Sequence, residues 1–230
     1  MNERPYVLLS VAASIDGYID DATETRLLLS SDADMDRVDE LRAGCDAILV
    51  GATTVRKDDP RLLIRSPARR QARVRRGQPA TPVKVTITRS GDLDPAAQFF
   101  TAGDPAKVVY AATPTLDKTR RRVGAAAEVV DAGDPTDLNR VLADLRRRGI
   151  ARLMVEGGGS LLTQLLTAGL ADELHLVIAP FFIGDSRAPR FVYDGRYPWN
   201  PQHHARLASA VQLDDAVLLR YALSERYPGP

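Results

Sequence analysis

The sequence has few of the side chains from which metal centres and disulfide frameworks are built. Cys45 is the only cysteine, and the only histidines are His175, His203 and His204. A lone cysteine cannot form an internal disulfide, which agrees with a reducing compartment. The sequence also lacks a Cys-x-x-Cys pair, a His-Glu-x-x-His motif and the His-x-Glu…Pro-Cys-x-x-Cys signature of zinc deaminases. We therefore expect no metal site and no zinc-dependent deaminase activity.

Long apolar runs and an excess of one charge are also missing. The longest apolar runs, at residues 6–13, 47–50 and 174–180, are far shorter than a membrane-spanning helix. The first residues are polar and lead into no basic region with an apolar run behind it, so we expect no secretory signal and a cytoplasmic location. The 31 Lys and Arg residues balance 30 Asp and Glu residues. Net charge therefore gives no reason to expect nucleic acid or an anionic membrane as a partner.

The rest of the sequence alternates strand and helix patterns. Nearly continuous apolar runs rich in β-forming residues are typical of strands that are covered on both faces. We predict such strands at residues 5–13, 46–50, 83–88, 107–112, 128–130, 152–155 and 174–179. Residues 206–212 and 217–222 predict a final antiparallel hairpin.

Helix signals stand between these strands. Ser31 and Asp34 form an approximate capping box, and apolar residues at helical spacing follow them until Gly44. A short helix is expected after Gly51, and it must end before Pro60 because the residue preceding a proline disfavours helical geometry.

Two further helices are predicted in the second half of the chain. Residues 134–137, Asp-Pro-Thr-Asp, place a cap, a proline and an acid where a helix begins, and Arg146–Arg148 supply cations to its last turn. Another helix is expected at residues 160–167. By contrast, residues 66–82 hold five arginines and three prolines and predict a long exposed loop. The alternation as a whole predicts an α/β fold with a mainly parallel mixed sheet, in a single domain over residues 1–230.

The strongest chemical signal is Val155-Glu156-Gly157-Gly158-Gly159-Ser160-Leu161, in which a strand ends, three glycines follow and a helix begins. Glycines let the backbone approach a ligand closely, and the N–H groups at a helix start attract anions. The motif is neither Gly-x-Gly-x-x-Gly nor a P-loop. A merely tight turn is the alternative, but three glycines exceed what such a turn needs. We therefore predict a phosphate-binding turn.

Three other turns follow predicted strands and are less specific. Thr54 and Asp58 follow the second strand, where a hydroxyl suits a phosphate and a carboxylate suits proton handling, although Asp58 and Asp59 also suit the end of a helix before a proline. Arg89 and Ser90 suit a phosphate monoester such as the 2′-phosphate of NADPH, or form an ordinary exposed loop. Residues 14–17, Ser-Ile-Asp-Gly, are typical of a turn.

The remaining candidate residues are weaker indications of function. Residues 65–76 contain six arginines, but no aromatic residues lie among them and the net charge is balanced, so we expect no nucleic-acid partner. His175 lies in an apolar run and is expected to be a hydrogen-bonded core residue. Cys45, before a strand, is expected to be a packed and inert thiol.

In combination these motifs indicate a family. Ser-x-Asp-Gly, then Gly-x-x-Thr-Val-x-x-Asp-x-Pro-x-Leu-x-x-Arg, then Val-Glu-Gly-Gly-Gly occur here in that order, and Pro180–Gly184 adds a Pro-x-x-x-Gly stretch. The set resembles the pyrimidine reductase of bacterial riboflavin biosynthesis, which is the C-terminal domain of a bifunctional deaminase-reductase. The resemblance covers this chain from about Arg4 to Leu223. The resemblance implies a dihydrofolate-reductase-like three-layer α/β/α fold, reduction of a ribosylamino-pyrimidine phosphate by NADPH, and a homodimer. The chain would lack the deaminase domain.

A hydride that reaches carbon requires a proton on the adjacent heteroatom, and Glu156 is our first candidate for the proton route because its strand ends beside the phosphate turn, with Asp58 as the second. The resemblance itself implies further residue roles. Substrate-facing residues are Arg26, Leu62, Arg65 and Glu156. NADPH-binding residues are Ala12, Leu28, Thr54, Asp58, Arg89, Ser90, Gly157, Gly158, Gly159, Ser160 and Leu161.

Two departures from the family pattern fall on the substrate side. Tyr18 stands where the family often has Lys, and Arg26 stands where a Ser is expected. They motivate an alternative, a dihydrofolate-type or other C=N reductase with the same cofactor. A second alternative is a non-catalytic protein that binds nucleotides or RNA.

Overall fold

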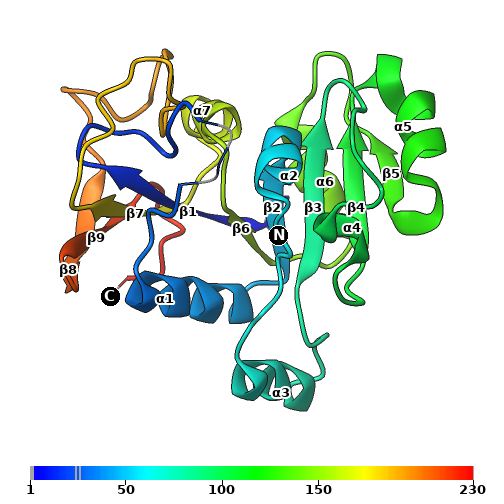
Figure 1. The fold of residues 1–230 in the computed structure, drawn as a ribbon, viewed down its shortest axis with the longest axis horizontal. Helices are drawn as coiled ribbons and strands as arrows, with labels where there is room; N and C mark the ends of the chain where they lie inside the picture. The colour runs from blue at the N-terminus through cyan, green and yellow to red at the C-terminus, as the bar shows by residue number, and fades with distance from the viewer. Residues whose placement is uncertain (1–2, 24, 26, 230) are drawn as a thin grey trace. The chain divides into compact units, whose positions relative to one another are not determined.

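The computed structural model describes residues 3–23, 25 and 27–229 (Figure 1). The chain divides into two compact units. The first comprises Met1–Pro5 and Asp39–Met154, and the second comprises Tyr6–Val38 and Val155–Pro230. The chain therefore passes from one unit to the other more than once. That the whole chain acts as a single domain stays a prediction.

The first unit is built on parallel strands. Strands β2 (Ala47–Gly51), β3 (Val83–Thr88), β4 (Lys107–Ala111) and β5 (Glu128–Asp131) lie in the order β5-β4-β3-β2, with β6 (Arg152–Val155) next to β2. Pairings such as Val50 with Thr86 set the register. The core holds Ile48, Val50, Val55, Leu62, Leu93, Phe99, Phe100, Val109 and Val123.

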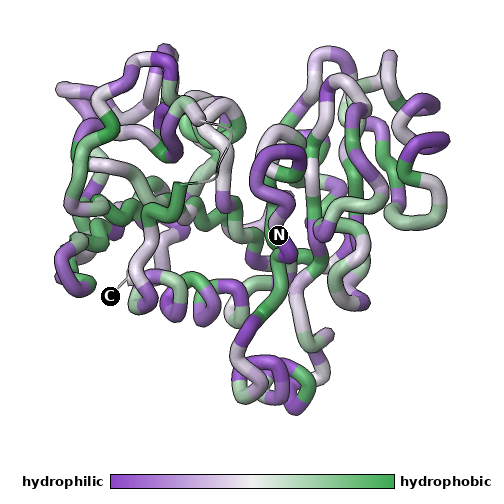
Figure 2. Tube along the Cα trace, in the orientation of Figure 1, coloured by the Kyte–Doolittle hydropathy of each residue, from purple (hydrophilic) through white to green (hydrophobic). Residues whose placement is uncertain are grey.

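Helices and short turns connect these strands. Helix α5 lies beside β5 (Figure 1), and Figure 2 shows α5 to be mainly hydrophilic. The connecting elements are α2 (Ala52–Asp58), α3 (Pro67–Arg75), α4 (Gln98–Thr101), η1 (Thr113–Thr115), α5 (Leu116–Val123), η2 (Gly124–Ala126) and α6 (Leu138–Arg147).

Residues 66–82 are not the exposed loop that their composition predicts. Most of this stretch forms helix α3, with Ser66 as its N-cap and Pro67 in its first turn. The prediction was wrong because proline at a first helical position favours a helix, and arginine is itself a good helix former. Arg73 is buried, and its guanidinium donates to the carbonyl oxygens of Ala43 and Pro79.

The start of α6 also differs from the sequence prediction. The cap is Asp137, whose Oδ1 accepts from the backbone N–H of Asn139 at 2.8 Å and of Arg140 at 3.3 Å. Asp134 and Pro135 precede the helix in a turn. The sequence prediction takes Asp134 as the cap because Pro135 suits a first helical position, and it is wrong because Asp137 is an equally good N-cap residue.

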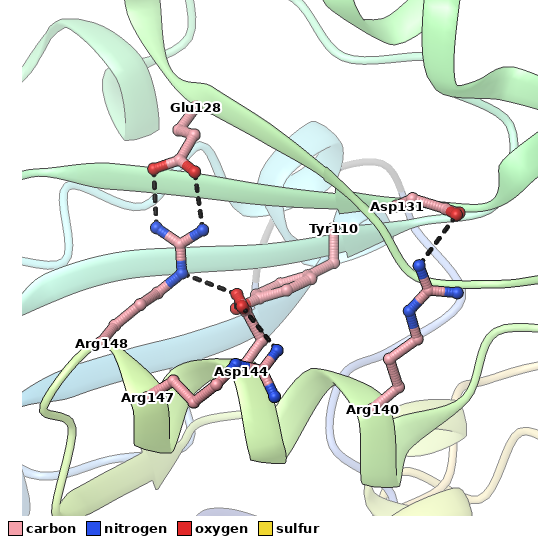
Figure 3. A network of polar contacts seen from close by, with 7 residues as sticks. All are labelled: Tyr110, Glu128, Asp131, Arg140, Asp144, Arg147 and Arg148. Atoms are coloured by element: carbon pink, nitrogen blue, oxygen red, sulfur yellow. Dashed lines mark hydrogen bonds and ion pairs between the residues drawn. The ribbon is translucent and has the colours of Figure 1, made fainter.

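A network of polar contacts joins α6 to β4 and β5 (Figure 3). Both terminal nitrogens of Arg148 donate to the Glu128 carboxylate at 2.6 Å, and its Nε donates to Asp144 at 2.6 Å. The Tyr110 hydroxyl donates to Asp144 at 2.7 Å. Burial raises the pKa of Asp144, but hydrogen bonds from Arg148 and Tyr110 outweigh burial and lower it. Asp144 is therefore held in its ionised form, and through it the network fixes α6 to the sheet.

The second unit contains the other strands. Strand β1 (Tyr6–Ser14) pairs in parallel with β7 (Glu173–Ala179), and β9 (Ala216–Ala222) pairs antiparallel with both β7 and β8 (Arg206–Leu213). The order is β1-β7-β9-β8. In Figure 2, β1 and β7 are drawn mainly in the hydrophobic colour. Helix α7 (Gly159–Thr167) belongs to this unit, and helix α1 (Asp32–Ala43) begins in it and continues into the first unit from Asp39.

His175 lies within this unit as a hydrogen-bonded core residue, as predicted. Its Nε2 pairs with Glu173 at 2.6 Å and its Nδ1 lies 3.1 Å from Arg37. Burial lowers the pKa of His175, against the opposing effect of Glu173. Both ring nitrogens of His175 therefore make contacts inside the core, and we assign this side chain a structural role.

The predicted α/β class, with mainly parallel strands and a C-terminal antiparallel hairpin, is confirmed. All strands predicted from apolar runs are present, and their ends lie within one residue of the predicted ones. Cys45 is buried and belongs to no disulfide. Within the described part of the chain, no helix combines the length and the apolar character needed to cross a bilayer.

Candidate functional site

The glycine turn after β6 leads into α7 as the sequence predicts. Gly157 has φ +120°, a conformation that side chains rarely adopt, and Gly158 is the N-cap of the helix. Leu161 and Leu162 donate to the Gly158 carbonyl at 3.0 and 3.1 Å. Among the described residues no side chain caps this end. Because the N–H groups that precede Leu161 have no acceptor within the helix, this end of α7 is suited to an anion.

Gly159 is needed for a different reason from Gly157. A Cβ built on Gly159 would lie 2.2 Å from the Arg190 carbonyl oxygen and 2.9 Å from the Tyr193 ring. The backbone of another segment therefore occupies the space of a side chain. This segment also donates from the Tyr193 N–H to the Thr163 hydroxyl at 3.0 Å. Part of the glycine signal consequently reports close packing within the protein rather than ligand approach.

The Ser14–Gly17 segment is a turn, and Asp16 is its organising residue. The Asp16 carboxylate accepts from the Ser14 hydroxyl at 2.6 Å and from the backbone N–H groups of Ile183 and Gly184 at 3.1 and 2.8 Å. The Ser14 hydrogen bond is the main cause that lowers the pKa of Asp16 to about 2. The carboxylate thus joins two sequence motifs that lie far apart along the chain.

The other second-unit candidates lie in different environments. Ala12 is a half-buried residue of β1 and pairs with Val177, whereas Leu28 is largely exposed. Glu156 is half-buried and stands between β6 and the glycine turn. Arg26 lies outside the described residues.

In the first unit, α2 carries Thr54 and Asp58. Thr54 is half-buried, and Asp58 is the last residue of the helix. Asp59 has φ +42° and binds Gln98 through its carboxylate, with the Gln98 side-chain amide at 3.0 Å. The two adjacent acids therefore differ, because Asp58 is the last residue of the helix while Asp59 ends it and fixes α4.

Leu62 and Arg65 follow α2. Leu62 has φ +48° and its side chain is buried in the core of the first unit. The backbone N–H of Arg65 donates to Asp39, while its side chain is largely exposed with Nε 4.0 Å from the same carboxylate. Asp39 also binds the guanidinium of Arg69 at 3.1 Å. Asp39 therefore fixes the backbone from which the Arg65 side chain projects.

Arg89 and Ser90 are both exposed immediately after β3. The Arg89 carbonyl accepts from Thr115 at 3.0 Å, and the Ser90 carbonyl accepts from the Lys118 ammonium at 3.0 Å. Gly91, with φ +67°, packs so closely that a Cβ would lie 2.4 Å from the Thr119 hydroxyl. The backbone of the turn is therefore held by Thr115 and α5. The side chains of Arg89 and Ser90 take no part in these contacts.

Sequence reasoning missed two residues that the structure brings to these turns. Lys118 comes from α5 and adds a cation beside Ser90. Arg190 lies against Gly159 and also contacts Tyr18. Neither residue belongs to a motif, and each lies far along the chain from its partner, so local spacing held no signal for them.

Comparison with known proteins adds independent information. The family model described as the RibD C-terminal domain matches residues 5–219. The 2,5-diamino-6-ribosylamino-4(3H)-pyrimidinone 5′-phosphate reductase of Archaeoglobus fulgidus is 38% identical over 194 residues, which cover 84% of this chain and 87% of that protein. Within the described residues, no group of three or more His, Cys, Asp or Glu side chains is arranged to hold a metal ion.

Solved structures give the same fold. A pyrimidine reductase-like protein from Corynebacterium diphtheriae superposes with a TM-score of 0.81 at 23% identity, covering 95% of this chain and 91% of that one. Dihydrofolate reductase from Enterococcus faecalis, solved in complex with NADP(H) and a second ligand, gives a TM-score of 0.53 at 12% identity, covering 94% and 95%. These identities are low, so the two structures establish the fold alone.

Proposed function

Because the chain belongs to the RibD C-terminal domain family, we propose that it is the NADPH-dependent reductase of a phosphorylated ribosylamino-pyrimidine in riboflavin biosynthesis. The observation that carries this proposal is the likeness to the archaeal reductase, which extends over most of both chains. The glycine turn at the start of α7 and the exposed Arg89 and Ser90 after β3 support it.

Each unit offers residues that suit one anionic group of a nicotinamide dinucleotide with a 2′-phosphate. The first turn of α7 offers N–H groups and the positive end of a helix dipole, which suit a pyrophosphate. Arg89, Ser90 and Lys118 offer a guanidinium, a hydroxyl and an ammonium, which suit a phosphate monoester. A hydroxyl in the place of that phosphate, as in NADH, would leave two cations without an anionic partner. We therefore propose NADPH as the cofactor.

The chemistry requires one hydride and one proton. NADPH, when bound, supplies the hydride from nicotinamide C4 to the sugar C1′. The protein must deliver a proton to the heteroatom next to C1′ and hold the substrate phosphate. Glu156 is proposed for the proton, since it is half-buried beside the glycine turn, with Asp58 as the second candidate. The exposed guanidinium of Arg65 is proposed for the substrate phosphate.

Two substrates of the same class remain to be separated by experiment. The resemblance implies 5-amino-6-(5-phosphoribosylamino)uracil, which carries an oxygen at pyrimidine C2. The archaeal relative is named for the 2,5-diamino compound, which carries an amine there. An amine donates and an oxygen accepts, so a polar group facing C2 distinguishes the two. The 38% identity to the archaeal enzyme makes the diamino compound the second candidate.

We also propose that the protein is a cytoplasmic homodimer. Strand β8 ends the strand order of the second unit. Its Leu207 and Val211 side chains are 51% and 45% exposed. Edge strands with exposed apolar side chains are available for pairing with another chain. Light scattering coupled to size exclusion tests the dimer, and a monomer at micromolar concentration contradicts it.

Thermal unfolding with each cofactor tests the proposal first. A ligand present at about 100 times its Kd adds roughly 2.7 kcal/mol of stability. A larger rise in Tm with NADPH than with NADH is expected. Turnover of the uracil phosphate, the diaminopyrimidinone phosphate and dihydrofolate is then compared by loss of NADPH absorbance. If the protein binds NADPH but reduces only dihydrofolate, dihydrofolate replaces the proposed substrate. If it binds neither NADPH nor NADH, the reductase proposal is overturned.

A further inference from the structure

We infer that Tyr18 and Arg190 form a positioning pair, which holds the N-terminal end of α7 in the place required by the cofactor pyrophosphate. This inference rests on the proposed function. All of the contacts that carry it lie within the second unit. Neither residue is part of the glycine turn itself, and the pair acts through the backbone of residue 190.

The two side chains are in close contact. The guanidinium carbon of Arg190 lies 4.5 Å from the centre of the Tyr18 ring, and its Nη2 donates to the Tyr18 hydroxyl at 2.9 Å. Tyr18 is 5% exposed, whereas Arg190 is exposed. A buried ring therefore serves as a fixed platform for a charged side chain on the surface, and such cation–aromatic contacts favour one orientation of the guanidinium.

The backbone around the pair is held to the Ser14–Gly17 turn. The N–H of Ile19 donates to the Pro189 carbonyl at 2.9 Å, and the N–H of Phe191 donates to the Gly17 carbonyl at 3.0 Å. These bonds flank Arg190 on both sides. They anchor its segment to the turn that Asp16 organises, but they do not by themselves fix the direction of the Arg190 side chain.

The carbonyl of Arg190 faces the other way, toward α7. Its oxygen occupies the space of a Cβ at Gly159, only 2.2 Å from where that atom would be. Three residues later, the Tyr193 N–H donates to the Thr163 hydroxyl, which itself donates to the Gly159 carbonyl at 2.8 Å. The segment therefore contacts the first residue of α7 directly and the first turn through Thr163.

These contacts form one path from the Tyr18 ring to the amides of the glycine turn. Because the Gly159 packing leaves no free space, a shift of the Arg190 carbonyl toward α7 must displace the start of the helix, and a shift away from it removes the support of the helix start. Hydrogen bonds to a pyrophosphate depend steeply on distance and angle. Loss of the pair should therefore weaken cofactor binding more than it weakens the fold, and it should leave the substrate side less affected.

The test compares Arg190→Met and Tyr18→Phe with a matched control, Arg187→Met. Arg187 lies in the same loop and forms an exposed ion pair with Asp185 at 2.7 Å, but it contacts neither Tyr18 nor Gly159 in the described set of contacts. Arg190→Met removes the charge and keeps an unbranched chain. Tyr18→Phe keeps the stacked ring and removes only the hydroxyl, so it provides a variant that is expected to fold.

The expected result is a selective change in cofactor affinity. Arg190→Met should raise the Kd and KM for NADPH about tenfold, with a smaller change in kcat and in the KM for the pyrimidine phosphate. Tyr18→Phe should raise the NADPH values about threefold, and Arg187→Met should leave them unchanged. Arg190→Lys, which keeps the charge but not the planar fork, should recover part of the loss.

The outcomes separate this inference from the function on which it rests. If the wild-type protein does not bind NADPH, the proposed function fails. If the wild type binds NADPH and both Arg190→Met and Tyr18→Phe bind it with the wild-type Kd, the positioning role is refuted. Equal increases in both KM values, together with a lowered Tm, would mean that the pair is merely structural and would also overturn the inference.

Discussion

The guanidinium of Arg73 lies in the protein interior, where its Nη1 donates to the carbonyl oxygen of Cys45 at 2.7 Å. The same nitrogen donates to Ala43 at 3.0 Å, and Nε donates to Pro79 at 2.8 Å. The carbonyls of residues 43 and 45 belong to the end of α1 and the turn after it. The arginine-rich sequence of α3, which is typical of a protein surface, thus contains one buried residue that donates to the carbonyl groups at the end of α1.

Arg73→Met should destabilise the protein by about 2–4 kcal/mol, because it leaves buried carbonyl groups without donors. Urea unfolding measures this change. Arg75→Met is the matched control, since Arg75 is exposed on the same helix, and its change should be within about 0.5 kcal/mol. Equal stabilities of the two variants would contradict the structural role of Arg73.

Lys84 predicts a pH dependence of stability. Its side chain is buried, and its ammonium donates to the carbonyl oxygens of Phe99 and Ala102 at 3.1 and 2.6 Å. Burial lowers its pKa from 10.5 to about 8. Between these values the unfolded chain binds more protons than the folded one, so folding becomes more favourable as the pH rises through this range.

The matched variant for this prediction is Lys84→Met, which cannot titrate. The difference in unfolding free energy, wild type minus variant, should increase between about pH 8 and pH 10. At neutral pH the variant should still be less stable, by about 1–3 kcal/mol, because the Phe99 and Ala102 carbonyls lose their donor. A pH-independent difference would show that the ammonium keeps its ordinary pKa in the folded protein.

The strands and the strand-to-helix turn before α7 could be predicted because their signals are local. The apolar run of β1 and Gly157, with its positive φ, each report their own backbone geometry. The role of α3 could not be predicted in this way, because the burial of Arg73 depends on where α1 ends. The same limit applies to Lys118 and Arg190, whose partners Ser90 and Tyr18 are distant along the chain and become neighbours only on folding.

The turn after β3 predicts how the protein distinguishes NADPH from NADH. Arg89→Ala should raise the KM for NADPH about 10- to 100-fold and leave that for NADH nearly unchanged, because a charge-assisted hydrogen bond to a phosphate is lost. Lys118→Ala should act in the same direction with a smaller effect, since Lys118 also bonds the Ser90 backbone. Steady-state kinetics with both cofactors measures the ratio.

Arg121→Ala serves as the control for this prediction. Arg121 is an exposed cation of the same helix, α5, so its removal tests whether general positive charge is responsible. The NADPH to NADH ratio should be unchanged in this variant. If all three variants lower the ratio equally, long-range attraction rather than a phosphate contact explains the preference.

Glu156 is the residue on which the proposed proton transfer depends. Glu156→Gln keeps the shape and the hydrogen-bonding capacity of the side chain but removes the proton that can be transferred. We expect kcat to fall about 10²- to 10⁴-fold, with NADPH affinity and Tm close to the wild-type values. Single-turnover measurements must accompany kcat, because slow product release hides a change in the chemical step.

Asp58→Asn provides the comparison that decides between the two carboxylates. Asp58 ends α2 in the first unit, while Glu156 precedes the glycine turn in the second, so the two substitutions perturb different parts of the fold. A large loss in Glu156→Gln with a small loss in Asp58→Asn assigns the proton to Glu156, and the reverse pattern assigns it to Asp58. Unchanged single-turnover rates in both variants would remove the proton from these side chains and direct the search to water or to a substrate group, because the hydride step still requires a proton on the adjacent heteroatom.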